Sequence, residues 1–463
     1  MDKLEELKEK ILFTPKTAYE VMTDEQCAES EAFARDYMKY MDAAKTEREA
    51  VDVTVKMAEA RGFRPYKLGD SVERGGKYYY NNRDKNIFLF VIGSEDIENG
   101  IRISAAHIDS PRIDLKQCPL YEDDKIAYFK THYYGGIKKY QWTAIPLALH
   151  GVVTKKNGET VTVTVGEEPD DPVLYISDLL PHLARTQMGQ TMSEGIKGEA
   201  LNLILGTKPY GGEYKPDAVK LNAMNFLYEK YGVTEEDLLS AELTAVPAEK
   251  ARFVGFDRSL IGAYGHDDRV CAYPATVAAL ECENPVHTVM TVLADKEETG
   301  SNGVSGMRSS IFVDLINSIS NALGGNESVV RANSMCLSAD VNAAYDPNFA
   351  DVYEKRNSSF LNRGVIMTKY TGAGGKSGTS DASAEFIGKI RALLDGENIL
   401  WQTGELGKID QGGGGTVAMF VANLNIETVD LGVPVLSMHA PYEVISTADL
   451  YMTARAFKAF FNK

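Results

Sequence analysis

Cysteine is scarce in this 463-residue chain, and its few cysteines follow no pattern. The five cysteines are scattered, odd in number and never spaced as C-x-x-C, which argues against a disulfide framework and a thiolate zinc site. Long apolar runs are also missing, so the sequence predicts no membrane span. The N-terminal stretch MDKLEELKEKILF is charged and amphipathic and lacks the apolar core of a signal peptide. These absences indicate a cytoplasmic protein with no membrane partner.

Positive charge is in deficit. The chain has 49 Lys and Arg residues against 66 Asp and Glu residues, and its net charge is −17. A phosphate backbone would be repelled, so nucleic acid is excluded as a partner. Apolar residues make up 44 % of the chain, enough for a large core that needs no metal or disulfide to hold it together. Domains usually run to about 100–200 residues, so we expect one very large domain or two moderate ones.

The pattern of apolar residues changes twice along the chain. Residues 1–62 are predicted to be helical, and β-type segments follow. Residues 119–252 read as a mostly β insertion, with a tight hairpin at Asn157-Gly158. Strands then alternate with helices, which predicts βαβ units. We therefore expect an α/β fold, with a mixed, largely parallel sheet covered by helices, in a discontinuous domain of residues 1–118 and 253–463.

Metal-competent side chains recur at the loops of this α/β pattern, mostly where a strand ends. Mixed histidine and carboxylate ligands suit zinc and similar divalent ions. Two such ions about 3.5–4 Å apart can hold a bridging hydroxide, and that site needs roughly five ligands. The five loops are Ala106–Ser110, Gly265–Arg269, Asp295–Gly300, Ser338–Asp340 and Met438–Pro441.

Each of these residues also has an ordinary structural explanation. A histidine that ends an apolar strand is more often a structural histidine, and Glu297-Glu298 alone would be a solvated pair. Asp267-Asp268 alone would be a helix N-cap. Five coincidences at consecutive loops are improbable together, so the set favours a dinuclear metal site. The stretch Gly372–Ser377 looks like a phosphate loop, but the first glycine of that pattern falls at Tyr370, so the pattern fails.

The same segments resemble a known family. The motifs are Ala106-His-Ile-Asp-Ser110, Asp267-Asp-Arg269, Asp295-Lys-Glu-Glu-Thr-Gly-Ser301, Ser338-Ala-Asp-Val-Asn342, Asp346-Pro-Asn-Phe349, Gly375-Lys-Ser-Gly378, Asp410-Gln-Gly-Gly-Gly-Gly-Thr416 and His439-Ala-Pro-Tyr-Glu-Val444. In this order they look like the aspartyl aminopeptidase family of dinuclear peptidases, and most like its bacterial branch. Some motifs also occur in the related tetrahedral aminopeptidases; the glycine run and the pattern around Lys376 favour the aspartyl family.

The resemblance implies a ligand set for two divalent ions, zinc first, with cobalt and manganese as alternatives. Asp267 would bridge both ions. His107 and Asp340 would complete one site, and Glu298 and His439 the other.

The resemblance also implies supporting roles for three neighbouring carboxylates. Glu297 would be the general base that takes a proton from the attacking water. Asp109 would hydrogen-bond His107 and fix its tautomer. Asp268 would orient the helix start, although the tandem aspartates leave open which of the two bridges the ions. Neighbouring strand residues point to opposite faces, so Glu297 and Glu298 can share a site only where the strand bends.

Assembly and specificity are also implied by the family. His182 lies in the stretch that would donate to the oxyanion in a neighbouring subunit's site, and the β insertion would be the dimerisation domain. Dimers would join into a tetrahedral dodecamer. Lys376 and Lys369 are candidates for binding an acidic substrate side chain, with ordinary surface lysines as the alternative.

The sequence thus predicts a metallo-aminopeptidase that releases N-terminal residues, acidic ones included, from peptides. Two alternatives stay open. One is a related dinuclear aminopeptidase of neutral or broad specificity, and the other is a catalytically silent shell protein that binds peptides.

Overall fold

The N-terminal quarter begins with helices, as predicted. A computed structural model describes residues 3–463 of the chain. Threonine caps start the second, third and fourth helices; for example, the Thr46 hydroxyl accepts the backbone N–H of Glu49, and the Glu49 side chain returns to the cap backbone. The helices are α1 (Lys3–Ile11), α2 (Ala18–Val21), α3 (Asp24–Ala43) and α4 (Glu47–Ala60).

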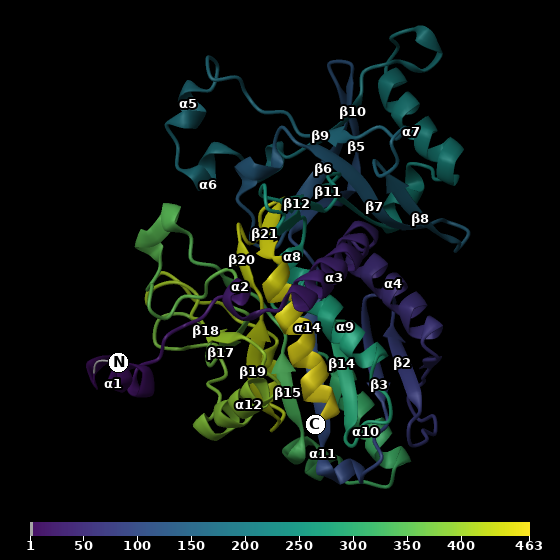
Figure 1. Cartoon of the computed structure of the whole chain (residues 1–463). Coiled ribbons are helices and arrows are strands. Elements are labelled where there is room, and N and C mark those ends of the chain that lie inside the picture. Colours follow the sequence, from purple (N-terminus) through teal and green to yellow (C-terminus); the bar gives the residue numbers. More distant parts are fainter. Residues whose placement is uncertain (1–2) are drawn as a thin grey trace.

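A nine-stranded mixed sheet forms the centre of the larger part of the molecule (Figure 1). Its middle strands β14, β4, β15 and β19 run parallel to one another, and antiparallel pairs join them to β3 on one side and β17 on the other. In spatial order the strands are β1 (Arg64–Pro65), β2 (Lys77–Asn82), β3 (Asn86–Val91), β14 (Thr288–Ala294), β4 (Ile101–His107), β15 (Met335–Ser338), β19 (Glu427–Gly432), β17 (Val365–Thr368) and β18 (Trp401–Thr403).

Helices cover both faces of this sheet, because alternate strand residues bury into two separate cores. In β3, Leu89 joins the core under α3 and α4, whereas Phe90 joins the core on the opposite face. The first face also holds α9 (Ala272–Leu280), α12 (Ala384–Gly396) and α14 (Thr447–Asn462), and the second holds α10 (Ile311–Ala322), α11 (Glu327–Asn333) and α13 (Ala418–Ala422). The predicted α/β class, a mixed sheet under helices, is confirmed.

A closed six-stranded β-barrel stands above the sheet in the view of Figure 1. It closes because β11 pairs antiparallel with both β5 and β7. In order around the barrel the strands are β11 (Ala241–Pro247), β5 (Arg112–Asp123), β6 (Ile126–Tyr134), β10 (Leu203–Gly206), β9 (Leu174–Tyr175) and β7 (Pro146–Thr154). The barrel has its own core around Trp142, which is fully buried.

Further elements decorate the barrel. The strand β8 (Thr160–Val165) pairs with the outer edge of β7 through the predicted hairpin, in which Gly158 has a φ of +88°. Helix α7 (Ala218–Tyr231) packs on the barrel, and an outlying arm carries α5 (Arg185–Met188) and α6 (Met192–Gly195). The predicted domain boundary between residues 118 and 119 falls inside β5, so the barrel strands begin earlier than expected; the division into domains and the dimerisation role stay predictions.

A third, five-stranded sheet joins the two parts. In order it holds β12 (Arg252–Val254), β13 (Leu260–Ala263), β21 (Glu443–Ser446), β20 (Pro434–Leu436) and β16 (Asn342–Ala343), and the short helix α8 (His266–Arg269) follows β13. Within residues 3–463, no helix is both long and apolar enough to cross a bilayer.

Candidate metal centre

Three parallel strands deliver the first group of site residues to one edge of the central sheet. In the register of β14 with β4, Ala294 lies opposite His107, and β15 runs beside β4 with Ser338 opposite Ala105. All three strands therefore end at the same level, where the loops of a parallel sheet form sites. The turn after β14 brings Glu297 and Glu298, and the loop after β15 brings Asp340.

The five predicted metal ligands meet in two overlapping groups. His107, Asp267 and Asp340 form one group, and Asp267, Glu298 and His439 form the other; within each group the candidate ligand atoms lie within 4.8 Å of one another. Asp267 belongs to both. Nε2 of His439 lies 2.9 Å from Asp267 Oδ2 and 3.3 Å from Glu298 Oε1.

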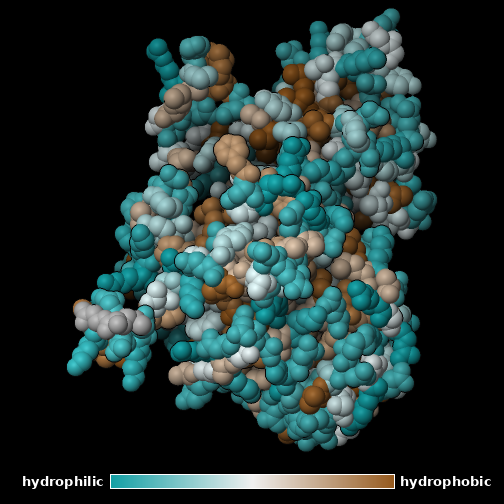
Figure 2. All heavy atoms as spheres, in the orientation of Figure 1, coloured by the Kyte–Doolittle hydropathy of each residue, from teal (hydrophilic) through white to brown (hydrophobic). Residues whose placement is uncertain are grey.

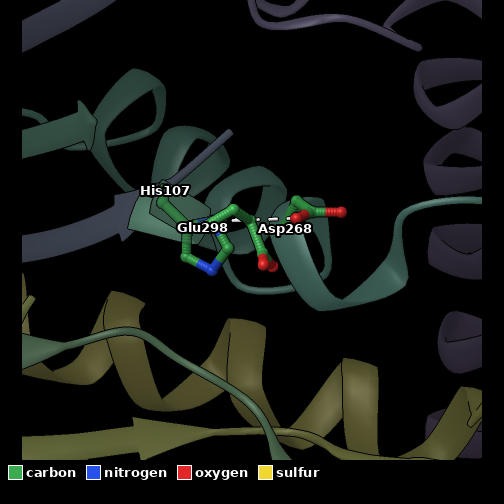
Figure 3. Close-up of side chains that lie close together, drawn as sticks. All are labelled: His107, Asp268 and Glu298. Carbon is green, nitrogen blue, oxygen red and sulfur yellow. Dashed lines mark ion pairs between the residues drawn. The ribbon is translucent and has the colours of Figure 1, made fainter. Parts of the chain in front are cut away.

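Asp268 forms a third group with His107 and Glu298 (Figure 3). It lies on the opposite side of the imidazole from Asp340: Nδ1 of His107 is 3.7 Å from Asp268, and Nε2 is 3.6 Å from Asp340. Both carboxylate oxygens of Asp268 are buried and lack a hydrogen-bond partner among the described residues. Asp268 and Asp340 therefore lie near opposite nitrogens of the ring.

Buried negative charge is concentrated at this centre. Burial and the neighbouring Asp267 raise the pKa of Glu298 well above its usual range, and burial raises the pKa of Asp340. Burial opposes the charging of His439, but its hydrogen bond to Asp267 and the charges of Asp267 and Glu298 raise its pKa to about 11. Carboxylates crowded in this way are stabilised by cations, and the mixed histidine and carboxylate donors fit zinc-like ions.

The bend that aims Glu297 and Glu298 into one site is present. Lys296 adopts a left-handed conformation with φ of 69°, and a 3-10 turn (Glu297–Thr299) follows. The Asp109 carboxylate fastens this turn, because it accepts the backbone N–H groups of Glu297 and Glu298 at 2.9 and 3.2 Å. Burial is the largest of the effects that raise the pKa of Glu297, to about 8.

Asp109 reaches His107 differently from the prediction. Its carboxylate oxygen lies 3.7 Å from Nδ1 of His107, beyond hydrogen-bond distance, and its backbone carbonyl at 3.3 Å accepts the Nδ1–H instead. The carboxylate points away from His107 because it accepts hydrogen bonds from the backbone amides of the Glu297–Thr299 turn and from the hydroxyl of Tyr134, which donates to it at 2.7 Å.

Glu443 is a site residue that the sequence reading did not assign, although it ends the His439–Glu443 segment. It is 1 % exposed, and its two oxygens accept the backbone N–H groups of Asp267 and His439 at 3.0 and 2.7 Å. The position of Glu443 four residues after His439 was the only local signal of its role. Its other partner, Asp267, is far away in the sequence and gives no local signal.

A cavity of about 430 Å³ opens beside the ligands. Its wall includes the glycine run at 413–415, where Gly413 has a φ of +106° and a Cβ would stand 2.1 Å from the carbonyl oxygen of Gly372. Glycine is therefore required there for the two loops to touch. The wall also holds Arg308 and Phe420, which the sequence reading did not single out.

The other predicted residues lie outside this cavity. Lys376 and Lys369 both pair with Asp381, and the ammonium group of Lys376 also sits 3.5 Å from the Tyr370 ring centroid. Lys376 lines a neighbouring cavity. His182 is exposed on the arm between β9 and α5 and does not line the metal cavity of its own chain.

A model of a known protein family matches most of the chain. Residues 40–461 match the model described as aminopeptidase I zinc metalloprotease (M18). The chain belongs to the M18 aminopeptidase family. This membership confirms the resemblance found in the sequence and the predicted class of metal-dependent aminopeptidase.

Individual M18 relatives cover nearly the whole chain. A probable M18 family aminopeptidase 1 from Clostridium acetobutylicum is 47 % identical, over 96 % of this chain and 98 % of the relative. The crystal structure of the Thermotoga maritima M18 aminopeptidase has a TM-score of 0.92 and 43 % identity, covering 97 % of this chain and all of the other. The structure of aminopeptidase I from C. acetobutylicum has a TM-score of 0.91 and 44 % identity, covering 98 % of this chain and all of the other.

Proposed function

We propose that this M18 aminopeptidase uses two divalent ions to hydrolyse the first peptide bond of peptides with a free N-terminus. Both ions would be zinc, and cobalt or manganese are the alternatives. The observation that carries the proposal is the pair of ligand groups that share Asp267. When bound, the two ions would polarise the scissile carbonyl and acidify the attacking water. His107 and Asp340 would hold one ion, and Glu298 and His439 the other.

Glu297 is proposed as the general base. Its carboxylate lines the cavity beside the ligand groups, and Asp109 holds its backbone amide, so the side chain has a defined position. It would take the proton of the attacking water and return it to the leaving amine, which general bases of this kind accelerate by about 10²- to 10⁴-fold. The buried site, which raises the pKa of Glu297, supports its capacity to keep that proton between the two steps.

Asp267 rather than Asp268 is proposed as the bridging ligand. Asp267 lies within reach of both histidine-bearing groups, and Asp268 faces the Nδ1 side of His107, where the ring proton is donated to the carbonyl of Asp109. An ion on the Nε2 side would leave Asp268 behind the imidazole. Asp268 would then orient the ring and add negative charge without binding the ions.

His182 is proposed to act in a neighbouring subunit of a homo-oligomer. The arm that carries it exposes apolar side chains: Leu179, Leu180, Leu183, Met188 and Met192 are each at least half exposed. Apolar surface is visible at the upper left of Figure 2, where this arm lies. Apolar surface of this kind is typical of a contact with another subunit. A yeast relative that shares the fold, mApe1, was solved as a dodecamer, and we propose dimers that assemble into such a dodecamer here.

Acidic first residues are the proposed preference, and neutral or broad specificity is the alternative. Lys376 and Lys369 stay candidates for this recognition, but each already has Asp381 as a partner. A silent peptide-binding shell protein is less favoured because the ligands and the base come together in one cavity.

A substrate panel tests the proposal. The purified protein is assayed on free and N-acetylated peptides that begin with Asp, Glu, Leu or Lys, with and without a chelator. We expect chelator-sensitive release of the first residue from free peptides alone, with Asp and Glu fastest. Preference for Leu or Lys would retain the mechanism and reject the acidic specificity, and no cleavage after zinc, cobalt or manganese is restored would support the shell protein.

A further inference from the structure

We propose that Arg308 binds a carboxylate of the peptide substrate and thereby favours peptides that bring a carboxylate into this cavity over peptides that do not. This inference rests on the proposed peptide hydrolysis at the metal centre and assigns a specificity residue to it. Arg308 follows the Glu297–Glu298 turn in the sequence and precedes α10.

The loop that carries Arg308 is tightly folded. The backbone N–H of Arg308 donates to the carbonyl of Ser301 at 3.0 Å, and Gly306 packs so closely that a Cβ would stand 2.2 Å from the same oxygen. The guanidinium carbon lies 5.2 Å from the ring centroid of Phe420, within cation–π range. The backbone and the aromatic ring together hold the side chain on the cavity wall.

Arg308 has no acidic partner among residues 3–463, because no carboxylate of these residues lies within 4 Å of its guanidinium. Lys376 and Lys369, in contrast, share Asp381. Its side chain is exposed to the cavity. Guanidinium presents a planar fork of N–H donors that matches a carboxylate, so an unpaired arginine here offers a ready anion site.

The charge of the cavity favours an anionic ligand near Arg308. Four carboxylates line the cavity, and two divalent ions would balance them. Arg308 is the only lysine or arginine on the wall, so it would supply the remaining positive charge. The four carboxylates belong to Asp267, Glu297, Glu298 and Asp340.

A peptide can present this carboxylate from two places. One source is the side chain of an N-terminal Asp or Glu, and the other is the free C-terminus of a very short peptide. Both would form the same two-pronged pair with the guanidinium, so the substrates of the experiment have to separate them.

The experiment compares the metal-loaded wild-type protein with Arg308→Met, which keeps the unbranched stem over Phe420 and removes the charge. The substrates are amidated Asp-Ala-Ala, amidated Leu-Ala-Ala, Leu-Ala and amidated Leu-Ala, and kcat/KM is measured for each. We expect Arg308→Met to lose on the order of 10- to 100-fold on the carboxylate-bearing substrates. Amidated leucine peptides offer the guanidinium no carboxylate and should lose much less, so the ratio of kcat/KM between the two kinds of substrate is the readout.

The pattern of losses identifies the source of the carboxylate. A loss on amidated Asp-Ala-Ala assigns Arg308 to the first side chain, and a loss on Leu-Ala but not on its amide assigns it to the C-terminus. Arg308→Lys should restore part of the preference because the charge returns without the fork. Arg61→Met, an exposed arginine at the end of α4, is the matched control and should change nothing.

Three results would overturn the inference. They are unchanged substrate ratios in Arg308→Met, equal losses on neutral amidated peptides, and loss of the acidic preference in Lys376→Met alone. Calorimetric binding of the same peptides to wild-type protein and Arg308→Met provides a second readout. If the wild-type protein cleaves no peptide, the proposed function fails. The carboxylate site would still be supported if the wild-type protein binds Asp peptides more tightly than Leu peptides and Arg308→Met does not. Equal binding of Asp peptides by the two proteins would reject it.

Discussion

The carboxylate of Glu443 accepts the backbone N–H of Asp267 at 3.0 Å, and its second oxygen accepts that of His439 at 2.7 Å. One buried side chain thus positions two of the five candidate ligands through their main chains. Partners of this kind set the geometry of a metal site without touching the ion.

Replacing Glu443 by Gln should therefore weaken ion binding by about 10- to 100-fold, the usual cost of losing such a partner. The amide has one acceptor oxygen, so its NH₂ group would face one of the two backbone N–H donors. Zinc titration against a competing chelator measures the affinity. Glu229→Gln on the surface of α7 is the control, and wild-type affinity in Glu443→Gln would contradict the assignment.

Glu297→Gln should keep both ions and lose about 10²- to 10⁴-fold in kcat, because the amide cannot take a proton from water. Elemental analysis and steady-state kinetics on one preparation give the two quantities. Turnover at the wild-type rate would remove Glu297 as the base.

His439→Ala should release one of two ions. The variant removes one nitrogen from the group of Asp267, Glu298 and His439 and leaves the group around His107 intact. Metal content per chain after dialysis should fall from two to about one. Full occupancy would show that the ligand set is incorrect.

His182→Ala should lower turnover without loss of metal if His182 serves a neighbouring subunit. The same change would be silent if the exposed histidine does no more than face solvent. Light scattering on the variant separates a lost donor from a lost assembly, since a donor variant should keep its oligomer size. Unaltered kinetics would reject the role in the neighbouring site.

Acid should destabilise the junction between the loop that joins α3 to α4 and the barrel. Burial works against ionised Glu167, but His150, Lys45 and Lys250 lower its pKa to about 2, against the ordinary 4.5. Because the folded pKa is the lower one, the unfolded chain binds more protons as pH falls, and the stabilisation present above pH 4.5 is lost towards pH 2.

A pKa difference of one corresponds to about 1.4 kcal/mol, so up to about 3 kcal/mol of the free energy of unfolding is lost across this window. Urea unfolding at fixed protein concentration from pH 6 to pH 3 should show a shallower pH slope in Glu167→Gln than in wild type. Parallel slopes would mean that Glu167 does not carry this acid sensitivity.

The loops that carry the candidate ligands could be recognised in the sequence because their signal is local, whereas the role of each residue was implied by the family resemblance. His107 ends an apolar strand, and Asp340 and the tandem glutamates lie a few residues beyond two others, so a strand pattern was enough to mark them as candidates. A strand pattern could not single out Glu443 and Arg308, because their roles depend on contacts with residues more than 100 positions away. Glu443 contacts Asp267, and Arg308 contacts Phe420.

The fold was predicted unevenly for a related reason. The hairpin at Asn157-Gly158 is indicated by these two residues alone, and the structure contains it. The strands Val365–Thr368 and Glu427–Gly432 were not predicted, since their segments are short and take their place from pairing with each other and with Met335–Ser338. The closure of the barrel depends on residues such as Leu147 and Pro247 meeting across about a hundred positions, which no local pattern encodes.

The closed barrel limits how another chain could attach to this part of the molecule. Six of its strands have neighbours on both sides, so the main-chain groups that are paired in these ladders are not available for extending the sheet. Within the described part of that sheet, β8 alone has a single neighbour, and its outer edge offers a whole strand to which a foreign strand could add. Subunits that meet through the paired stretches of the barrel would recognise one another by side chains and loops, whereas docking along β8 would use main-chain hydrogen bonds.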